Sequence, residues 1–146
     1  MLLLIILIIS GDFDKMIRMK TIEVSSAIII KEKKVFITQR GYGDFKDKWE
    51  FPGGKLEKGE SGEDCIVREI KEELDADIEV ISFLSTIEYA YPSFHLIMHN
   101  YLCRFKKDHL SLLEHEAAKF VNIADLDSID FLPADKLILD DIRKAI

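Results

Sequence analysis

The fold of this chain is decided by residues 49–76, which read WEFPGGKLEKGESGEDCIVREIKEELDA. A short apolar run ends at a turn-prone Pro-Gly-Gly, a polar loop follows, and Ser61 stands where a helix N-cap belongs. Glu63 and Asp64 supply the negative charge that the first turn of a helix favours. The stretch therefore predicts a strand, a loop and a helix in that order.

Two faces of the predicted helix carry different chemistry. Ile66, Ile70 and Leu74 follow helical spacing and predict the face that docks on the core. Three carboxylates at i, i+3 and i+4 share an adjoining face, namely Glu69, Glu72 and Glu73. Like charges at this spacing destabilise a helix by a few tenths of a kcal/mol, so the cluster needs a cation.

A solvated helix face is the commoner reading of such charges, with Arg68 and Lys71 as partners. The preceding Gly-Gly turn and two loop carboxylates, Glu57 and Glu60, favour a metal site instead. Hard divalent cations such as Mg²⁺ bind one or two carboxylates together with waters and substrate phosphates. The stretch thus predicts the site that cleavage of a polyphosphate requires.

The run Gly54, five residues, Glu60, seven residues and then REIKEE at 68–73 resembles the signature of the Nudix hydrolases. That signature is G-x5-E-x7-R-E-U-x-E-E-x-G-U, where U is aliphatic, and every charged position matches. The one clear departure is Asp75 in place of a glycine that ends the helix in a left-handed conformation. Aspartate is one of the few other residues that tolerate this conformation, so catalysis is not put in doubt.

Flanking matches at residues 39–40, 49–55 and 131–135 are similar to the MutT-type branch, including the CTP pyrophosphohydrolases, so the resemblance covers about residues 20–146. It implies a single domain with the Nudix fold, an α/β architecture in which helices sandwich a mixed β-sheet. The sequence pattern itself predicts strands at 21–30, 35–40, 49–51, 77–91, 94–105 and 118–123, a helical turn at 124–128 and a final helix at 134–145.

The resemblance implies a Mg²⁺-dependent enzyme, with Mn²⁺ as a substitute ion. The implied metal ligands are the backbone carbonyl of Gly53 and the carboxylates of Glu69, Glu72 and Glu73, with Glu57 nearby. Glu69 is also the leading candidate to orient or deprotonate water. Glu116, expected in a loop before the 118–123 strand, resembles an additional catalytic and metal-binding carboxylate, with Glu114 as the alternative.

Other matching residues are expected to position ligands or bind substrate. Arg68 and Glu60 resemble the pair that holds the loop against the helix. Arg40 and Lys55 are expected to contact the phosphates of the substrate. Arg40 lies at a strand end, where a charge that only improves solubility is the alternative.

Two further residues are expected to contact the nucleobase of the substrate. Phe51 could line a base pocket or pack in the core, and Asp135 is expected at the base edge, the alternative being a plain helix-start aspartate. A carboxylate only accepts hydrogen bonds, so Asp135 favours bases that display donors. Cytidine-type and 8-oxo-dGTP-type substrates are therefore close rivals.

Three functions remain open at this stage. The favoured one is hydrolysis of nucleoside triphosphates to a monophosphate and pyrophosphate, in a nucleotide-pool sanitising role. The alternatives are a Nudix hydrolase of ADP-ribose or another diphosphate-linked substrate, and a noncatalytic Nudix-fold ligand sensor.

Composition narrows the partners and the compartment. A chain of 146 residues with 48% hydrophobic and 32% charged residues fits one compact domain. Its net charge of −7 argues against binding nucleic acid, so we expect a small-molecule nucleotide as partner. The two cysteines, Cys65 and Cys103, have no metal-binding spacing and are expected as reduced thiols, with a disulfide between them as the alternative. We expect a cytoplasmic monomer or homodimer.

The first residues form a separate apolar run, MLLLIILIIS. It is much shorter than the roughly 20 residues of a membrane span and has neither a basic region nor a cleavage site of a signal peptide. We expect residues 1–19 to be a non-native or disordered extension, with the native start at Met16 or Met19. An added edge strand and a weak membrane tether are the alternatives.

Overall fold

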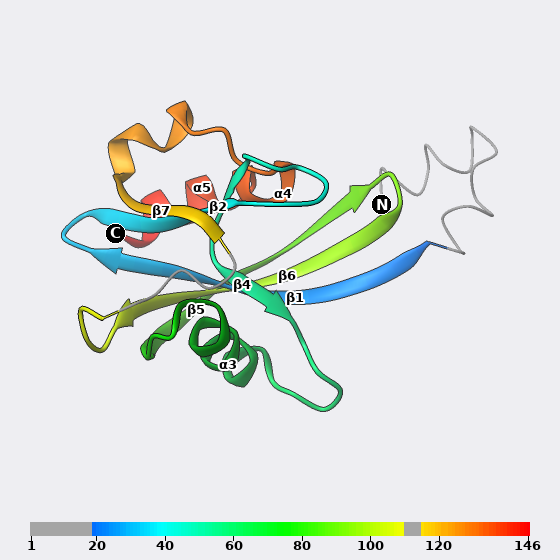
Figure 1. The fold of residues 1–146 in the computed structure, drawn as a ribbon, viewed down its shortest axis with the longest axis horizontal. Coiled ribbons are helices and arrows are strands. Elements are labelled where there is room, and N and C mark those ends of the chain that lie inside the picture. Colours follow the sequence, from blue (N-terminus) through cyan, green and yellow to red (C-terminus); the bar gives the residue numbers. More distant parts are fainter. Residues whose placement is uncertain (1–18, 110–114) are drawn as a thin grey trace.

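The computed structural model describes residues 19–109 and 115–146, in which seven strands form a mixed sheet with helices on both faces (Figure 1). The hydrogen-bonded path across the sheet is β3-β2-β1-β6-β5, while β4 pairs with β1 and β7 pairs with β2. The strands are β1 (Lys20–Lys31), β2 (Lys34–Arg40), β3 (Trp49–Glu50), β4 (Gly53–Lys55), β5 (Ile78–Tyr91), β6 (Phe94–Phe105) and β7 (His115–Asn122). The predicted α/β architecture is confirmed.

Strand β1 is the centre of the sheet. It runs parallel to β6 from the pair Lys20 and Phe94 to the pair Ile29 and Cys103. Its last residues pair antiparallel with β2. β5 and β6 form the predicted antiparallel hairpin. The sheet therefore contains both strand directions, and β1 connects its two halves.

The two faces of the sheet support two separate hydrophobic clusters. Helix α3 (Gly62–Leu74) buries the predicted face Ile66, Ile70 and Leu74 against Ala27 and Ile29 of β1. On the other face, α4 (Pro133–Lys136) and α5 (Leu139–Ala145) pack with the intervening β1 residue, Ile28. This alternation follows from the two-residue period of a strand, and it places α3 below the sheet and α4 and α5 above it in Figure 1.

Helix α3 begins and ends as the sequence predicts. The Ser61 side chain accepts a hydrogen bond from the Asp64 N–H at 3.1 Å. Asp75 adopts the left-handed conformation (φ 49°, ψ 42°), and its N–H donates to the Lys71 carbonyl at 3.1 Å. The Ser25 hydroxyl also donates to the Gly62 carbonyl at 2.9 Å, so the first turn of α3 is tied to β1.

Strand β4 was predicted as a turn and loop, because Pro-Gly-Gly is a turn signal. It is instead a strand antiparallel to β1, with Gly53 opposite Ser26 and Gly54 opposite Ser25. A Cβ atom on Gly53 would collide with the Ser25 carbonyl oxygen. The glycines therefore allow a close approach between two strands, and the prediction of a turn was wrong.

Two further boundaries differ from the sequence-based expectation. The single final helix is divided into α4 and α5, because the Leu137 and Ile138 N–H groups donate to residues three positions back, Ala134 and Asp135. This tight turn interrupts the α-helical pattern. Strand β7 begins at His115, paired with Arg40, so the backbone of Glu116 lies in a strand and not in a loop.

Some predictions fall outside the described residues, namely the extension at residues 1–18, Glu114 and the side chain of Glu116. In the described part of the chain, no helix combines the length and apolar character needed to cross a membrane.

Candidate active site

A cleft of about 930 Å³ brings most of the predicted site residues together. Gly53, Gly54 and Glu73 line it, and so do Phe51 and Asp135, which come from distant parts of the chain. Further lining comes from β1, from the loop after β2 and from the β5–β6 hairpin. Of the predicted metal ligands, Gly53 and Glu73 line the cleft together with the expected base residues, whereas Glu57, Glu69 and Glu72 are not among its lining residues.

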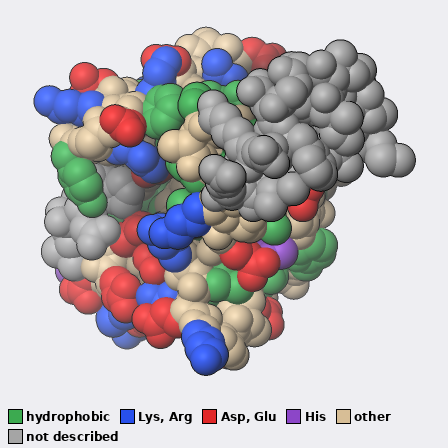
Figure 2. Space-filling model, turned by 90° about the vertical axis from the view of Figure 1, so that its right-hand side faces the viewer, with side chains coloured by type: hydrophobic (Ala, Val, Ile, Leu, Met, Phe, Trp, Pro, Cys, Tyr) green, Lys and Arg blue, Asp and Glu red, His purple; other side chains and the backbone are tan. Residues whose placement is uncertain are grey.

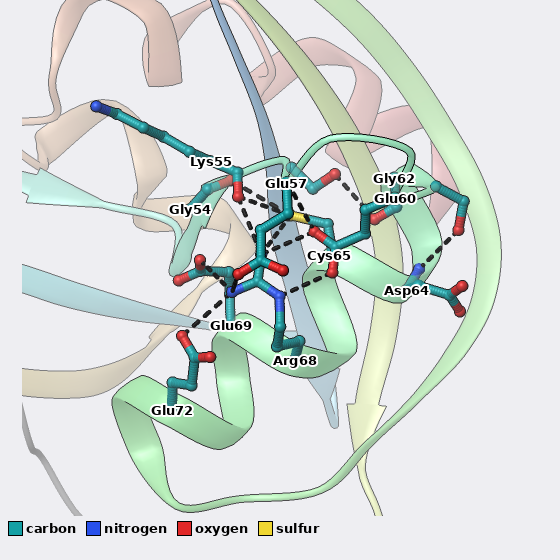
Figure 3. A network of polar contacts seen from close by, with 12 residues as sticks. Gly54, Lys55, Glu57, Glu60, Gly62, Asp64, Cys65, Arg68, Glu69 and Glu72 are labelled. Carbon is teal, nitrogen blue, oxygen red and sulfur yellow. Dashed lines mark hydrogen bonds and ion pairs between the residues drawn. The ribbon is translucent and has the colours of Figure 1, made fainter.

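Arg68 organises the loop and the helix beside this cleft (Figure 3). Its Nε and Nη2 donate to the two carboxylate oxygens of Glu60 at 2.7 and 2.8 Å, and Nη2 also donates to the Lys55 carbonyl at 3.0 Å. Its Nη1 contacts Glu69 at 2.8 Å and Glu72 at 3.2 Å. The predicted contact between Arg68 and Glu60 is confirmed.

These contacts also set the charge of the pair. Hydrogen bonds from Arg68, supported by the Glu57 N–H, lower the pKa of Glu60 to about 2. The Glu60 hydrogen bonds likewise raise the pKa of the Arg68 guanidinium. The pair therefore stays charged across the physiological pH range, and the loop remains fastened to the helix.

Glu69 lies directly against Gly54. A Cβ atom on Gly54 would collide with the Glu69 carboxyl group, so a larger residue at this position would displace that carboxylate. Arg68 holds the same carboxylate from the other direction. Two independent features thus fix the position of the residue expected to orient water.

The other two glutamates of the cluster, Glu72 and Glu73, lie in different environments. Glu73 is only 7% exposed and lines the cleft with Gly53. The side chain of Glu72 is 56% exposed and pairs with Arg68. Within the described residues, no three acidic, histidine or cysteine side chains gather closely enough to hold an ion. The helix therefore places the three carboxylates on adjacent positions without gathering their oxygens.

The donors nevertheless fit a hard divalent cation. Mg²⁺ requires only one or two protein carboxylates, because waters and substrate phosphates supply the other oxygens. Glu73 and Gly53 on the cleft and Glu69 over Gly54 offer oxygen atoms alone. Nudix hydrolases generally require a divalent metal, and this donor set has the corresponding chemistry.

Asp135 is a buried acid on the same cleft. It is 5% exposed, and its Oδ2 accepts a hydrogen bond from the Phe51 N–H at 2.8 Å. Burial, reinforced by the nearby Glu50, raises the pKa of Asp135 to about 8. At neutral pH the group therefore holds a proton and can donate as well as accept, whereas the sequence reasoning treated it as an acceptor only.

Arg40 lines the cleft but has protein partners. Its Nη2 donates to Glu50 at 2.8 Å and its Nη1 to the Asp44 carbonyl at 3.4 Å. Burial disfavours the Arg40 charge, but the Glu50 carboxylate outweighs it and the pKa of Arg40 is raised. Its role on phosphate stays a prediction, and the structure adds a role in connecting the 41–48 loop to β3.

Phe51, Lys55 and Glu57 occupy three different environments. Phe51 is 3% exposed and stacks on Phe131 with ring centroids 5.0 Å apart, so it packs in the core and also lines the cleft. Lys55 is exposed on the cleft. Glu57 is largely exposed, and its carboxylate lies 3.8 Å from Arg68.

Phe45, Glu50 and Tyr91 are among the cleft residues that sequence reasoning missed. Glu50 lies within the matching stretch 49–55, which could have singled it out. Phe45 and Tyr91 have no local signal, because only the sheet topology brings the loop after β2 to the β5–β6 hairpin.

The expectation that the chain does not bind nucleic acid stays a prediction. Figure 2 shows acidic and basic side chains interspersed on one face of the described molecule, without a continuous basic area. Phosphate backbones bind to clustered Lys and Arg, and the net charge of −7 acts in the opposite direction.

Comparison with known proteins agrees with this site. A protein-family model described as "NUDIX domain" matches residues 19–142 of the sequence. The chain is 29% identical over 128 residues to the 8-oxo-dGTP diphosphatase of Escherichia coli (strain K12), covering 86% of this chain and 99% of the relative. It is 41% identical over 69 residues to the CTP pyrophosphohydrolase of the same organism, covering 47% and 51%.

Solved structures agree as well. The solution structure of the E. coli ORF135 protein superposes with a TM-score of 0.77 at 29% identity, covering 86% of this chain and 91% of that one. With the signature residues arranged on the loop, strand β4 and helix α3 described above, the chain belongs to the Nudix family of hydrolases.

Proposed function

We propose that this chain is a Mg²⁺-dependent nucleoside triphosphate pyrophosphohydrolase that releases a nucleoside monophosphate and pyrophosphate. The observation that carries the proposal is the single cleft lined both by Gly53, Gly54 and Glu73 and by Phe51 and Asp135. Its volume of about 930 Å³ is that of a small-molecule site. The names of the relatives, an 8-oxo-dGTP diphosphatase and a CTP pyrophosphohydrolase, support the substrate class.

The residues that would hold Mg²⁺, or Mn²⁺ as its substitute, are Glu69, Glu72, Glu73 and the Gly53 carbonyl. When bound, such an ion neutralises phosphate oxygens and lowers the pKa of water. Glu57 and Glu116 stay proposed contributors to the same centre.

The protein side of the reaction depends on fixed positions. Glu69, held between Gly54 and Arg68, would orient the attacking water and accept its proton. Lys55, exposed on the cleft, would bind the phosphates as a point charge, and Arg40 would assist from the end of β2. The Glu60–Arg68 pair acts through Glu69 by holding the loop in place.

Asp135 is proposed to read the base edge. One of its oxygens accepts from the Phe51 N–H, and the residue lines the cleft. As a neutral acid it presents both a donor and an acceptor. Cytosine displays an amino donor beside a ring acceptor, and oxidised guanine displays ring and amino donors beside O6. Both bases match, which keeps cytidine-type and 8-oxo-dGTP-type substrates as rivals and fits a sanitising role.

The test is a release assay for pyrophosphate and monophosphate across canonical, methylated and oxidised nucleoside triphosphates with Mg²⁺. We expect Glu73→Gln and Glu72→Gln to abolish turnover while circular dichroism shows an intact fold. Glu63→Gln, an exposed glutamate on the same helix, is the matched control and should retain the wild-type rate. An unchanged rate in either of the first two variants would defeat the ligand assignment.

The same panel tests the base-edge role. Asp135→Asn is expected to change the ranking of the substrates, because an amide presents fixed donors and one acceptor. If the ranking stays the same, Asp135 does not read the base. If the wild-type chain releases pyrophosphate from none of the triphosphates, the proposed function itself is wrong.

A further inference from the structure

Aromatic rings gather where the 41–48 loop meets the turn of the β5–β6 hairpin. The Tyr91 ring is central, with Phe45 edge-on at 5.5 Å, Tyr89 edge-on at 4.7 Å and Phe94 stacked at 4.9 Å between centroids. Phe45, Tyr91 and Phe94 all line the cleft. One wall of the cleft is therefore aromatic.

This wall is joined to the base-edge residue. The Tyr91 hydroxyl accepts a hydrogen bond from the Ala134 N–H at 3.2 Å, and Ala134 directly precedes Asp135 in α4. Tyr91 is also 6% exposed, so its ring has little freedom. The contacts Phe45 to Tyr91, and Tyr91 to Ala134, place the aromatic wall beside the Asp135 carboxyl group.

The loop is built to present Phe45. Its two ends are joined by hydrogen bonds from the Arg40 N–H to the Lys48 carbonyl at 3.0 Å and from the Asp47 N–H to the Arg40 carbonyl at 2.9 Å. Within this loop Phe45 has a positive φ of 64°, a conformation that is unfavourable for a bulky side chain. Strain of this kind persists where the surrounding structure imposes it and concentrates at functional sites.

Phe45 also keeps a ring surface available. It is 38% exposed although one side contacts Tyr91. Tyr42 in the same loop is 69% exposed and has no ring contact among the described residues. Phe45 is thus the loop aromatic that is both fixed against the wall and open to the cleft.

We infer that Phe45 is a specificity-determining residue whose ring stacks on the nucleobase held at Asp135. The inference rests on the proposed function, because it requires a base in this cleft. Stacking on an aromatic ring favours any base through its π face, and a purine offers a larger face than a pyrimidine. Phe45 therefore strengthens binding of the base, while Asp135 recognises the hydrogen-bonding groups on the edge of the base.

The experiment measures binding by calorimetry, so that it does not depend on turnover. The ligands are non-hydrolysable α,β-methylene triphosphates of deoxyguanosine and deoxycytidine, and a base-free ribose triphosphate analogue. Phe45→Leu, which keeps apolar volume but removes the ring, should weaken binding of the guanine ligand about tenfold or more and of the cytosine ligand less. Binding of the base-free ligand should not change, and Phe45→Tyr should restore the affinity.

The matched control is Phe83→Leu. Phe83 is also an exposed phenylalanine, 57% exposed and edge-on to Tyr101, but it does not line the cleft, so its replacement should leave every affinity unchanged. Equal affinities in Phe45→Leu and wild type would overturn the inference. An equal loss for the base-free ligand would also overturn it, because Phe45 would then act only through the loop.

Failure of the two proposals can be told apart. If the wild-type chain releases no pyrophosphate from any nucleoside triphosphate, the proposed function fails. A loss of affinity for the guanine ligand in Phe45→Leu would still show that the cleft binds a base against Phe45, and an unchanged affinity would overturn the stacking role as well. If the wild-type chain turns nucleotides over with a KM that Phe45→Leu does not change, the stacking role alone fails. A chain that binds no nucleotide overturns both.

Discussion

Replacing the buried acid Asp135 by asparagine should remove a large pH dependence from the stability of this domain. The pKa of Asp135 is raised from an ordinary value of 3.8 to about 8 by burial and by Glu50. The folded chain therefore binds more protons here than the unfolded chain between those values. The free energy of unfolding of the wild type must fall as the pH rises through this range.

The size of the effect follows from the size of the pKa shift. Each pKa unit corresponds to 1.36 kcal/mol, so ionisation of Asp135 in the unfolded chain lowers stability by about 4 kcal/mol between pH 4 and pH 7. Above pH 9 the loss levels off at about 5 to 6 kcal/mol. Asparagine keeps an acceptor for the Phe51 N–H but cannot ionise. The Asp135→Asn variant should therefore gain stability relative to the wild type as the pH rises.

The assay is urea unfolding of both chains at pH 5, 6, 7, 8 and 9, followed by circular dichroism. Any cost of fitting the amide is the same at each pH, so the change in the difference is the informative quantity. Asp125→Asn, an exposed aspartate in the helical turn η1 (Ile123–Ser128), controls for the lost charge and should follow the wild type. A difference between Asp135→Asn and wild type that stays constant from pH 5 to pH 9 would refute the reasoning.

Three further outcomes follow from the same structure. Gly54→Ala should displace the Glu69 carboxylate and lower kcat about 100-fold, but it should cause no additional loss when Glu69 is already replaced by alanine. If Gly54→Ala lowers kcat equally with and without Glu69, Gly54 acts by another route. In Arg68→Lys, lysine cannot reproduce the two hydrogen bonds that the guanidinium donates to Glu60, so the Mg²⁺ concentration for half-maximal activity should rise about 10- to 100-fold. The surface variant Arg143→Lys should leave that concentration unchanged. Both cysteines are free and buried, and burial raises the pKa of Cys103 to about 12. A thiol reagent should therefore label neither cysteine until urea unfolds the chain, and rapid labelling in buffer would contradict the packing.

Local patterns predicted the parts of the fold that local physics controls. Ser61 as N-cap, Asp75 in the left-handed conformation and the apolar face of α3 all follow from residues within one or two helical turns. The contact between Arg68 and Glu60 also lies within a single loop and helix, where its spacing in the family signature is informative.

What sequence reasoning missed depends on partners distant in the chain. Gly53 and Gly54 have the composition of a turn, and only the approach of β1 makes them a strand. The protonated state of Asp135 results from burial among residues more than 80 positions away. The aromatic wall likewise requires the loop carrying Phe45 to meet Tyr91, which no periodicity in either segment indicates.

The central pairing of β1 with β6 has a consequence for synthesis of the chain on the ribosome. Ten residues of β1 find their parallel neighbours only 74 positions later, starting with Lys20 and Phe94. Until β6 has left the exit tunnel, the first strand can form only its short pairings with β2 and β4. The nascent domain must therefore carry an open apolar edge through most of its translation, and it closes only when the second half of the protein arrives.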